Sequence, residues 1–291
     1  FIEAVRQLSE MAGLPLPEND RASDVAAQQR KATVDACEAA AGFFVSQLHT
    51  KKGAAALHYI RQRGLSDDVI VDFRLGYAPR GGLFAHLQQR EFSTELVRSA
   101  GLVGVSDRDG SVYDYFRDRL IFPIEDPRGQ VIGFGARALG EVKPKYLNSP
   151  ESPSFVKKSV LYGWSRARKA ARRGLPVIVV EGYMDVIAVS SSGVAAAVAP
   201  LGTALSEEQF RLLWKLSNDP VLCFDGDKAG QIAAQRAIER VLPLLEPGRS
   251  VRLAVLPEGQ DPDDILRQKG PDGLRRILSA ATGLLDSLWA S

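Results

Sequence analysis

The feature that most constrains this chain is a short apolar run that ends abruptly in acid-glycine, and it occurs twice. Residues 177–180 are followed by Glu181-Gly182, with Asp185 four positions after the glutamate. Residues 221–224 are followed by Asp225-Gly226-Asp227. Such runs are typical of buried parallel strands, whose carboxyl ends deliver side chains into the crevice where open α/β sheets bind ligands. The pattern therefore predicts carboxylates gathered at one sheet edge.

A third acidic cluster, Asp261-Pro262-Asp263-Asp264, follows another strand-like run at residues 251–256. If these carboxylates converge with the first two groups, their like charges either raise the pKa values or require a cation. Oxygen ligands in such numbers suit Mg²⁺ or Mn²⁺, with substrate phosphates completing the coordination shell. The alternative is that each acid only caps the N-terminus of a helix. Because the acids recur at successive strand ends, we favour a metal site.

The net charge of +2 conceals a strong segregation of charge along the chain. Residues 117–173 contain 13 Lys and Arg against 5 Asp and Glu, whereas residues 174–267 contain 8 against 13. A basic half beside an acidic, metal-binding half is what an enzyme acting on a polyanion needs. The alternative, a solvated Arg-rich helix surface, accounts for part of the basic half.

The composition excludes several other classes of protein. At 291 residues, the chain can bury a full core and form two domains. Only Cys37 and Cys223 are present, so we expect no disulfide framework and no zinc site, and a reducing cytoplasm fits. No apolar run reaches transmembrane length, and we expect no membrane binding. Because the chain starts without methionine, we expect a fragment of a longer protein.

Glycine, proline and polar residues divide the chain into regions. We expect a short helix at residues 2–12, a helical region at residues 31–65, and a β-hairpin of residues 120–124 and 131–135. Residues 143–158 have little periodicity and are predicted to form a long ordered loop. From residue 174, strands alternate with helices, which predicts right-handed βαβ units. The predicted strands are residues 177–180, 194–198, 221–224 and 251–256.

We therefore predict an α/β protein with three regions. Residues 1–173 form a mixed α+β subdomain whose basic side chains suit a polyanion. Residues 174–268 form a Rossmann-like, mostly parallel sheet that binds the metal. Residues 269–291 are the third region. In the second region, Ser206-Glu207-Glu208-Gln209 is a capping box that predicts a helix running to Leu216.

The two acidic motifs carry a family resemblance. Residues 181–185 together with residues 225–230 resemble the Toprim domain of bacterial primases, type IA and type II topoisomerases and several nucleases. Five further segments narrow the resemblance: residues 63–65, 76–79, 116–124, 133–137 and 145–151. Together they resemble the RNA polymerase domain of bacterial DnaG-type DNA primases, over about residues 31–289.

The resemblance implies a DNA-dependent RNA polymerase that makes short RNA primers on single-stranded DNA from ribonucleoside triphosphates, with two or three Mg²⁺ or Mn²⁺ ions. It implies Glu181, Asp225 and Asp227 as metal ligands, with Asp261 and Asp263 as further ligands. Asp185 joins Glu181, Asp225 and Asp227 in the implied catalytic set. The implied nucleotide- and template-binding residues are Arg63, Arg117, Arg119, Arg137, Lys145, Tyr146, Asn148 and Lys157.

The resemblance also implies partners for the full-length protein, namely the replicative helicase and the single-strand-binding protein at a cytoplasmic replication fork. We expect this chain to lack the family's zinc-binding and helicase-binding domains. The resemblance implies that residues 269–291 begin the family's helical subdomain. Only residues 273–277 and 284–289 could begin it here, so we expect this subdomain to be cut short. Two alternatives remain: a Toprim nuclease or topoisomerase fragment that cleaves phosphodiesters, and a non-catalytic nucleic-acid-binding module.

Overall fold

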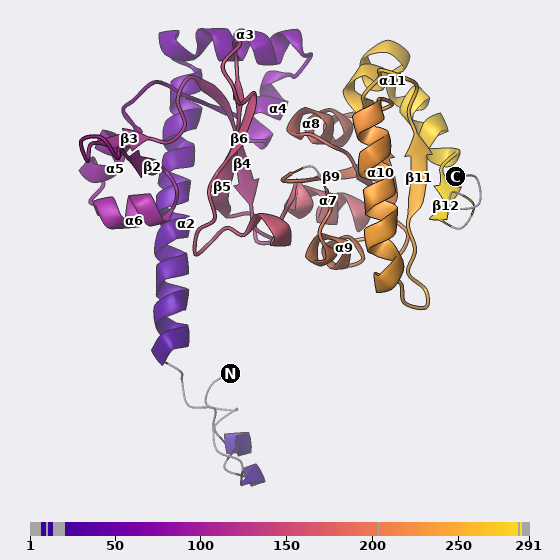
Figure 1. Cartoon of the computed structure of the whole chain (residues 1–291), viewed down its shortest axis with the longest axis horizontal. Coiled ribbons are helices and arrows are strands. Elements are labelled where there is room, and N and C mark those ends of the chain that lie inside the picture. Colours follow the sequence, from indigo (N-terminus) through magenta and orange to yellow (C-terminus); the bar gives the residue numbers. More distant parts are fainter. Residues whose placement is uncertain (1–6, 10, 14–20, 203, 285, 287–291) are drawn as a thin grey trace.

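The computed structural model describes residues 7–9, 11–13, 21–202, 204–284 and 286. Residues 7–9 and 11–12 are helical, and the rest of the helix predicted at residues 2–12 lies outside the described residues. In Figure 1 the N-terminal elements gather on one side and the C-terminal elements on the other. None of the described helices is long and apolar enough to cross a membrane.

The N-terminal half is built on one long helix, α2 (Arg21–Leu48), drawn in indigo in Figure 1. Its buried positions include Cys37, Ala41, Phe44 and Leu48, at the three- and four-residue spacing of one helix face. In β1 (Gly76–Ala78), a Cβ on Gly76 would lie 2.6 Å from the Phe44 Cβ, so glycine allows the close approach of sheet and helix.

The helical region predicted at residues 31–65 is confirmed as helical, but it begins earlier and is interrupted. After α2 ends at Leu48, the chain forms η1 (Lys51–Gly53) and then α3 (Ala54–Gln62). A Cβ on Gly53 would lie 2.4 Å from the Gln47 carbonyl oxygen, so this tight corner requires glycine.

A four-stranded antiparallel sheet packs against α2, in the order β1-β4-β5-β6. The predicted hairpin is confirmed, because β4 (Arg119–Glu125) and β5 (Val131–Ala138) pair antiparallel. The loop predicted at residues 143–158 contains a strand, β6 (Tyr146–Asn148), which pairs with β5, and η2 (Lys157–Ser159). A strand of three residues is too short to show a periodic pattern in sequence.

Five smaller elements complete this half of the molecule. Two of these elements are strands, which pair with each other in a separate antiparallel sheet. The five elements are α4 (Asp67–Asp72), α5 (Leu83–Gln89), α6 (Thr94–Ser99), β2 (Val103–Val105) and β3 (Val112–Asp114).

The C-terminal half contains a six-stranded sheet in the order β12-β11-β10-β8-β9-β7. The four predicted strands are confirmed and are mutually parallel. They are β8 (Val177–Val179), β9 (Ala196–Pro200), β10 (Val221–Phe224) and β11 (Arg252–Val255). The edge strands β7 (Leu161–Tyr162) and β12 (Thr282–Gly283) are antiparallel to their neighbours. The predicted α/β fold with a mostly parallel sheet is therefore confirmed.

Helices cover both faces of this sheet. Successive residues of a strand point to opposite faces, so neighbouring residues of β8 pack against different helices. Ile178 packs in one cluster with α8 (Tyr183–Ser192) and α11 (Pro262–Ser279). Val179 packs in another with α7 (Trp164–Ala171), α9 (Glu207–Leu213) and α10 (Lys228–Val241), which η3 (Leu242–Leu244) follows. The capping box predicted at Ser206 is present.

The helix predicted at residues 273–277 is the second part of α11, after a break at Gly270, whose φ is 66°. Of the segment predicted at residues 284–289, residues 285 and 287–289 lie outside the described residues.

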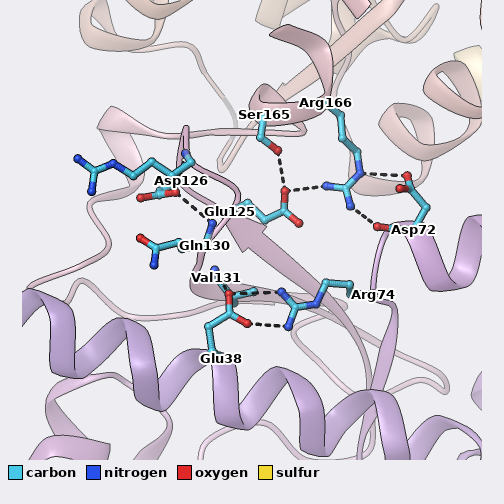
Figure 2. Close-up of polar contacts among 10 residues, drawn as sticks. Glu38, Asp72, Arg74, Glu125, Asp126, Gln130, Val131, Ser165 and Arg166 are labelled. Carbon is cyan, nitrogen blue, oxygen red and sulfur yellow. Dashed lines mark hydrogen bonds and ion pairs between the residues drawn. The ribbon is translucent and has the colours of Figure 1, made fainter. Parts of the chain in front are cut away.

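Polar side chains join the two sheets at the contact drawn in Figure 2. Glu125, the last residue of β4, accepts hydrogen bonds from Ser165 Oγ at 2.6 Å and from Arg166 Nη1 at 2.7 Å, both on α7. Arg166 Nε also donates to Asp72 Oδ2 of α4 at 3.2 Å. Since α7 precedes residue 174 and yet packs on the six-stranded sheet, it links both halves. The division into residues 1–173, 174–268 and 269–291 remains a prediction.

Candidate active site

Two of the predicted acids lie side by side because their strands are parallel neighbours. Val221 and Leu222 of β10 pair with Ile178 and Val179 of β8, so both carboxyl ends reach the same sheet edge. The Asp225 backbone N–H donates to Glu181 Oε1 at 3.0 Å. Burial raises the pKa of Glu181, and burial together with the charge of Glu181 raises the pKa of Asp225 to about 7.

Two glycines allow this edge to close. A Cβ on Gly226 would lie 2.0 Å from the Pro257 carbonyl oxygen, and one on Gly230 would lie 2.1 Å from the Asp225 carbonyl oxygen. The Gly226 N–H donates to the Gln260 carbonyl at 3.2 Å. The glycine after the strand-end acid is therefore required for the loop after β10 to lie against the loop after β11.

Three further acids are fixed at helix N-termini. Asp227 and Asp261 are the N-caps of α10 and α11, where each accepts a backbone N–H, at 2.8 and 2.6 Å respectively. Asp185, buried in the first turn of α8, accepts from the Gly182 N–H at 3.1 Å. Burial, followed by the charges of nearby aspartates, raises the pKa of Asp185 well above its usual range. These acids therefore cap helices, as the alternative interpretation predicted. Each of these hydrogen bonds uses one of the two carboxylate oxygens, so helix capping and cation binding are compatible.

A cavity of about 520 Å³, here called the central cavity, opens beside these carboxylates and is lined by residues of both halves. The predicted site residues in its lining are Arg63, Arg137, Lys145, Tyr146, Asn148, Glu181, Asp185, Asp225 and Asp261. The predicted residues outside its lining are Asp227, Asp263, Arg117, Arg119 and Lys157. The structure therefore brings carboxylates and basic side chains to one space.

Asp263 is a buried acid at the start of α11. Its Oδ2 lies 2.8 Å from Nη2 of Arg63 and 3.7 Å from Nε of Arg267. Burial raises the pKa of Asp263, although both arginines act to lower it. Arg63 therefore lines the central cavity and neutralises a buried carboxylate at the same time.

The carboxylates fit a divalent cation in charge and donor type. Among the described residues, no group of three or more His, Cys, Asp or Glu side chains is arranged to hold a metal ion. Asp225 Oδ1, however, is buried and has no hydrogen-bond partner in the described part of the chain. Mg²⁺ commonly uses one or two carboxylates and takes its other ligands from water and substrate phosphates. Glu181 and Asp225 are therefore the residues best placed to bind such an ion.

Aromatic rings support the basic side chains of the central cavity. The Arg137 guanidinium lies 4.3 Å from the centroid of the Tyr59 ring and 6.0 Å from that of Tyr146. Lys145 Nζ is also 6.0 Å from the Tyr146 ring. Arg137 Nε is buried without a hydrogen-bond partner in the described residues. Arg137 Nη1 donates to the Ala138 carbonyl at 3.4 Å. Stacking of this kind holds a guanidinium in place and leaves its other N–H groups for an anionic ligand.

Arg117 and Arg119 line a second hollow, of about 670 Å³, together with Tyr113 and Tyr115. The Arg117 guanidinium lies 4.9 Å from the centroid of the Tyr113 ring. Arg119 is buried, and its Nη1 donates to the Pro144 carbonyl at 2.8 Å, so it also holds the chain that leads into β6. Lys157 lies in η2 and lines neither the second hollow nor the central cavity.

Two family models match the chain. The N-terminal domain of the DNA primase catalytic core matches residues 43–168, and a Toprim-like model matches residues 178–266. A solved DnaG primase catalytic domain bound to ssDNA is 39% identical, with a TM-score of 0.80 over 89% of this chain and 81% of that one. This chain belongs to the DnaG-type DNA primase family.

Other DNA primases are similar to this chain as well. A DNA primase domain from Pseudomonas aeruginosa is 44% identical, with a TM-score of 0.82 over 89% of this chain and 82% of that one. The curated DNA primase of Pseudomonas aeruginosa is 43% identical over 98% of this chain and 44% of its own length. That of Escherichia coli strain K12 is 37% identical over 100% of this chain and 51% of its own length. The chain spans about half the length of these curated primases, and the predicted family resemblance is confirmed.

Toprim primases depend on divalent metal ions. In this chain the Toprim match contains the acids of the central cavity, whereas the match to the primase N-terminal domain contains Arg63, Arg137 and Lys145. The central cavity therefore lies where the two parts of the DnaG-type core meet.

Sequence reasoning missed two tyrosines of the central cavity, Tyr59 and Tyr183. Tyr183 stands within the predicted acid motif, between Gly182 and Asp185, which was a usable signal. Tyr59 precedes Arg63 by four residues, a spacing that places two side chains on one helix face.

Proposed function

We propose that this chain is the catalytic core of a primase, a DNA-dependent RNA polymerase that makes short RNA primers on single-stranded DNA. The central cavity carries the proposal. Glu181, Asp185 and Asp225 line the same space as Arg137 and Lys145. Carboxylates suit divalent cations, and basic side chains suit the triphosphate of a ribonucleotide, so the cavity has both parts of a nucleotidyl-transfer site.

Glu181 and Asp225 would hold Mg²⁺ or Mn²⁺, in two or three copies, with Asp185, Asp227, Asp261 and Asp263 as further ligands or supports. When bound, such cations lower the pKa of an attacking 3′-hydroxyl and stabilise charge on the phosphate that is transferred. Glu181 is an alternative proton acceptor, because burial raises its pKa. The basic residues that would bind and orient the triphosphate are Arg63, Arg137 and Lys145, with Tyr146 and Asn148 in the same lining. Lys157 lies outside this lining and remains a predicted contact to nucleotide or template.

The template would run through the second hollow. Arg117 lies beside Tyr113, and the combination of cations and aromatic faces suits single-stranded nucleic acid. Arg119 would shape the wall of this hollow. Two solved relatives support binding of DNA by a core of this kind: a DnaG catalytic domain bound to ssDNA, and the RNA polymerase domain of Mycobacterium tuberculosis primase in complex with double-stranded DNA, which is 35% identical with a TM-score of 0.79.

The longer protein to which such a core belongs would act at a cytoplasmic replication fork, with the replicative helicase and the single-strand-binding protein as partners. This part of the proposal is supported by family membership alone.

Template-directed incorporation of labelled ribonucleotides on single-stranded DNA, with and without Mg²⁺ or Mn²⁺, tests the proposal. The wild-type chain should make short RNA only when the metal is present. Glu181→Gln and Asp225→Asn should abolish synthesis, while circular dichroism and thermal unfolding show a retained fold. Strand cleavage without incorporation would instead indicate a nuclease or topoisomerase, and DNA binding without either reaction would indicate a binding module.

A further inference from the structure

Tyr183 anchors the acidic motif of one sheet on the face of the other. It is the first residue of α8, comes two positions after Glu181, and is buried. Its ring stacks on Phe122 of β4, with centroids 4.9 Å apart and an interplanar angle of 8°. Tyr162 contacts the same ring edge-on, at a centroid distance of 4.7 Å. Tyr183 is therefore fixed by packing between Phe122 of the N-terminal sheet and Tyr162 of the C-terminal sheet.

A row of residues in register across three strands receives the Tyr183 ring. Phe122 of β4 pairs with Gly135 of β5, and Gly135 pairs with Asn148 of β6. Paired residues of neighbouring strands project from the same face of a sheet. A Cβ on Gly135 would lie 2.2 Å from Tyr183 Cζ and 2.3 Å from its Oη. The Phe122 ring, the open space at Gly135 and the Asn148 amide together form the packing site of this tyrosine, here called the Tyr183 seat.

Asn148 joins the Tyr183 hydroxyl to a third element. The hydroxyl donates to Asn148 Oδ1 at 2.5 Å, and Asn148 Nδ2 donates to the Leu201 carbonyl at 3.1 Å. Since an amide oxygen only accepts and an amide nitrogen only donates, the two bonds fix the orientation of the Asn148 side chain. Leu201 follows β9 and lines the central cavity. One amide therefore ties α8 and the loop after β9 to β6.

We infer that Tyr183 is a positioning residue that sets the spacing between the carboxylates and the basic side chains of the central cavity, through its seat on Phe122, Gly135 and Asn148. The inference rests on the proposed function. It assigns Asn148 to holding Tyr183, in place of the predicted contact with nucleotide.

Some ligands contact only one half of the molecule, whereas others contact both halves. Binding of a cation needs only the carboxylates around Glu181, and binding of single-stranded DNA needs only the second hollow. A ribonucleoside triphosphate with its metal would contact the carboxylate side and the Lys145 side together. A loosened Tyr183 seat should therefore weaken triphosphate binding selectively.

Tyr183→Phe tests this, because it keeps the ring and removes only the hydroxyl. Loss of the bond leaves the Asn148 amide oxygen unsatisfied, which should weaken binding of ATP in the presence of Mn²⁺ about tenfold. Mn²⁺ binding alone, followed by electron paramagnetic resonance, and binding of a fluorescein-labelled oligothymidylate, followed by anisotropy, should stay within about twofold of wild type. In primer synthesis the KM for ATP should rise by the same factor as the ATP dissociation constant.

Tyr162→Phe is the matched control. Its hydroxyl is buried and has no hydrogen-bond partner among the described residues, although its ring contacts Tyr183. The same chemical change one ring away should leave all three binding constants unchanged. Gly135→Ala should weaken ATP binding more than Tyr183→Phe does, because its Cβ would displace the ring. If Gly135→Ala does not fold, the Tyr183→Phe result decides alone.

A double-mutant cycle with Asn148→Ala separates the two roles of Asn148. If the amide acts through Tyr183, Asn148→Ala should weaken ATP binding in the wild type but add less than about twofold in the Tyr183→Phe background. An equal loss in both backgrounds would show that Asn148 acts on ATP binding independently of Tyr183 and would overturn the inference. A parallel loss of Mn²⁺, DNA and ATP binding would overturn it as well, since it would mark Tyr183 as a support of the fold only. These binding measurements need no polymerase activity, so failure of the proposed function would appear separately, as absent incorporation by the wild type.

Discussion

Arg63 and Asp263 form an ion pair in which Nη2 lies 2.8 Å from Oδ2 and the aspartate side chain is 4% exposed. One was predicted to bind phosphate and the other to bind metal, and the structure shows that each neutralises the other. Both predicted roles remain predictions. Because a buried carboxylate that loses its partner carries its desolvation penalty uncompensated, the pair has a consequence for stability.

Arg63→Ala should lower the free energy of unfolding by about 2–3 kcal/mol at pH 7.5, measured by urea denaturation. The loss should fall short of that for a fully buried pair, because Arg267 remains 3.7 Å from the same oxygen. The double variant Arg63→Met/Asp263→Leu should recover most of it. Arg61→Ala is the control, since its pair with Asp67 is exposed and should be worth less than about 1 kcal/mol. Wild-type stability in Arg63→Ala would contradict the assignment.

Without divalent metal, the protein should become less stable as the pH rises. The folded-state pKa of Asp225 is about 7, and the pKa values of Glu181 and Asp185 are also raised, with burial as the first cause. Between about pH 4 and 7 the folded state therefore binds more protons than the unfolded state, so stability falls through this window. Thermal unfolding in EDTA from pH 5 to 8 should show a declining Tm, and saturating Mg²⁺ should reduce the decline.

Asp225→Asn is the matched variant for this pH dependence. It removes a like charge beside Glu181 and keeps the backbone N–H that Glu181 accepts. At pH 8 in EDTA it should unfold at a higher temperature than wild type, and its Tm should respond less to Mg²⁺. If Mg²⁺ does not change the Tm of the wild type at pH 8, the result would contradict a cation site at these carboxylates.

The sheet edge with its acids could be predicted because strands buried on both faces leave a continuous apolar run in the sequence. Glu181 and Asp225 follow such runs, and parallel pairing of β8 and β10 brings them together. The helix caps could also be predicted from the sequence, because Asp227 and Asp261 each directly precede a helix. What the local pattern could not decide was whether such an acid caps a helix, binds metal, or does both.

Contacts between distant segments could not be predicted from any local pattern. The Tyr183 hydroxyl meets Asn148 in β6, a strand of three residues that the sequence suggested to be loop. The partner of Arg63 likewise lies near the other end of the chain. Such pairings depend on how two sheets pack, so residue type and spacing alone assign these side chains to ligand binding when they also hold the protein together.

Gly226→Ala should destabilise the protein by about 1–3 kcal/mol, because the added Cβ would lie 2.0 Å from the Pro257 carbonyl oxygen and backbone cannot move as a flexible side chain does. It should also separate Asp225 from Asp261 and so weaken the response of the Tm to Mg²⁺. The control is Gly140→Ala, where a Cβ would meet nothing within 4 Å and which should stay within about 0.5 kcal/mol of wild type. Equal stability of the two variants in urea would refute the requirement for glycine at this loop.

Arg166→Met should separate stability from ligand binding. Its guanidinium joins α7 to Glu125 and Asp72 (Figure 2), and the Glu125 side chain is only 12% exposed. Methionine keeps an apolar stem near the Phe73 ring, over which the guanidinium lies at 4.6 Å, and removes only the charge. The free energy of unfolding should fall by about 2–3 kcal/mol, because Glu125 loses its cation and, among the described residues, keeps only the Ser165 hydroxyl as a partner.

Since Arg166 does not line the central cavity, Arg166→Met should bind ATP with Mn²⁺ as tightly as wild type at temperatures where it is folded. Arg211→Ala is the control, because its ion pair with Glu207 is exposed on a single helix and should contribute less than about 0.5 kcal/mol. The opposite pattern, unchanged stability with weakened ATP binding, would mean that the contact in Figure 2 tunes the central cavity and that Tyr183 is not alone in setting its spacing.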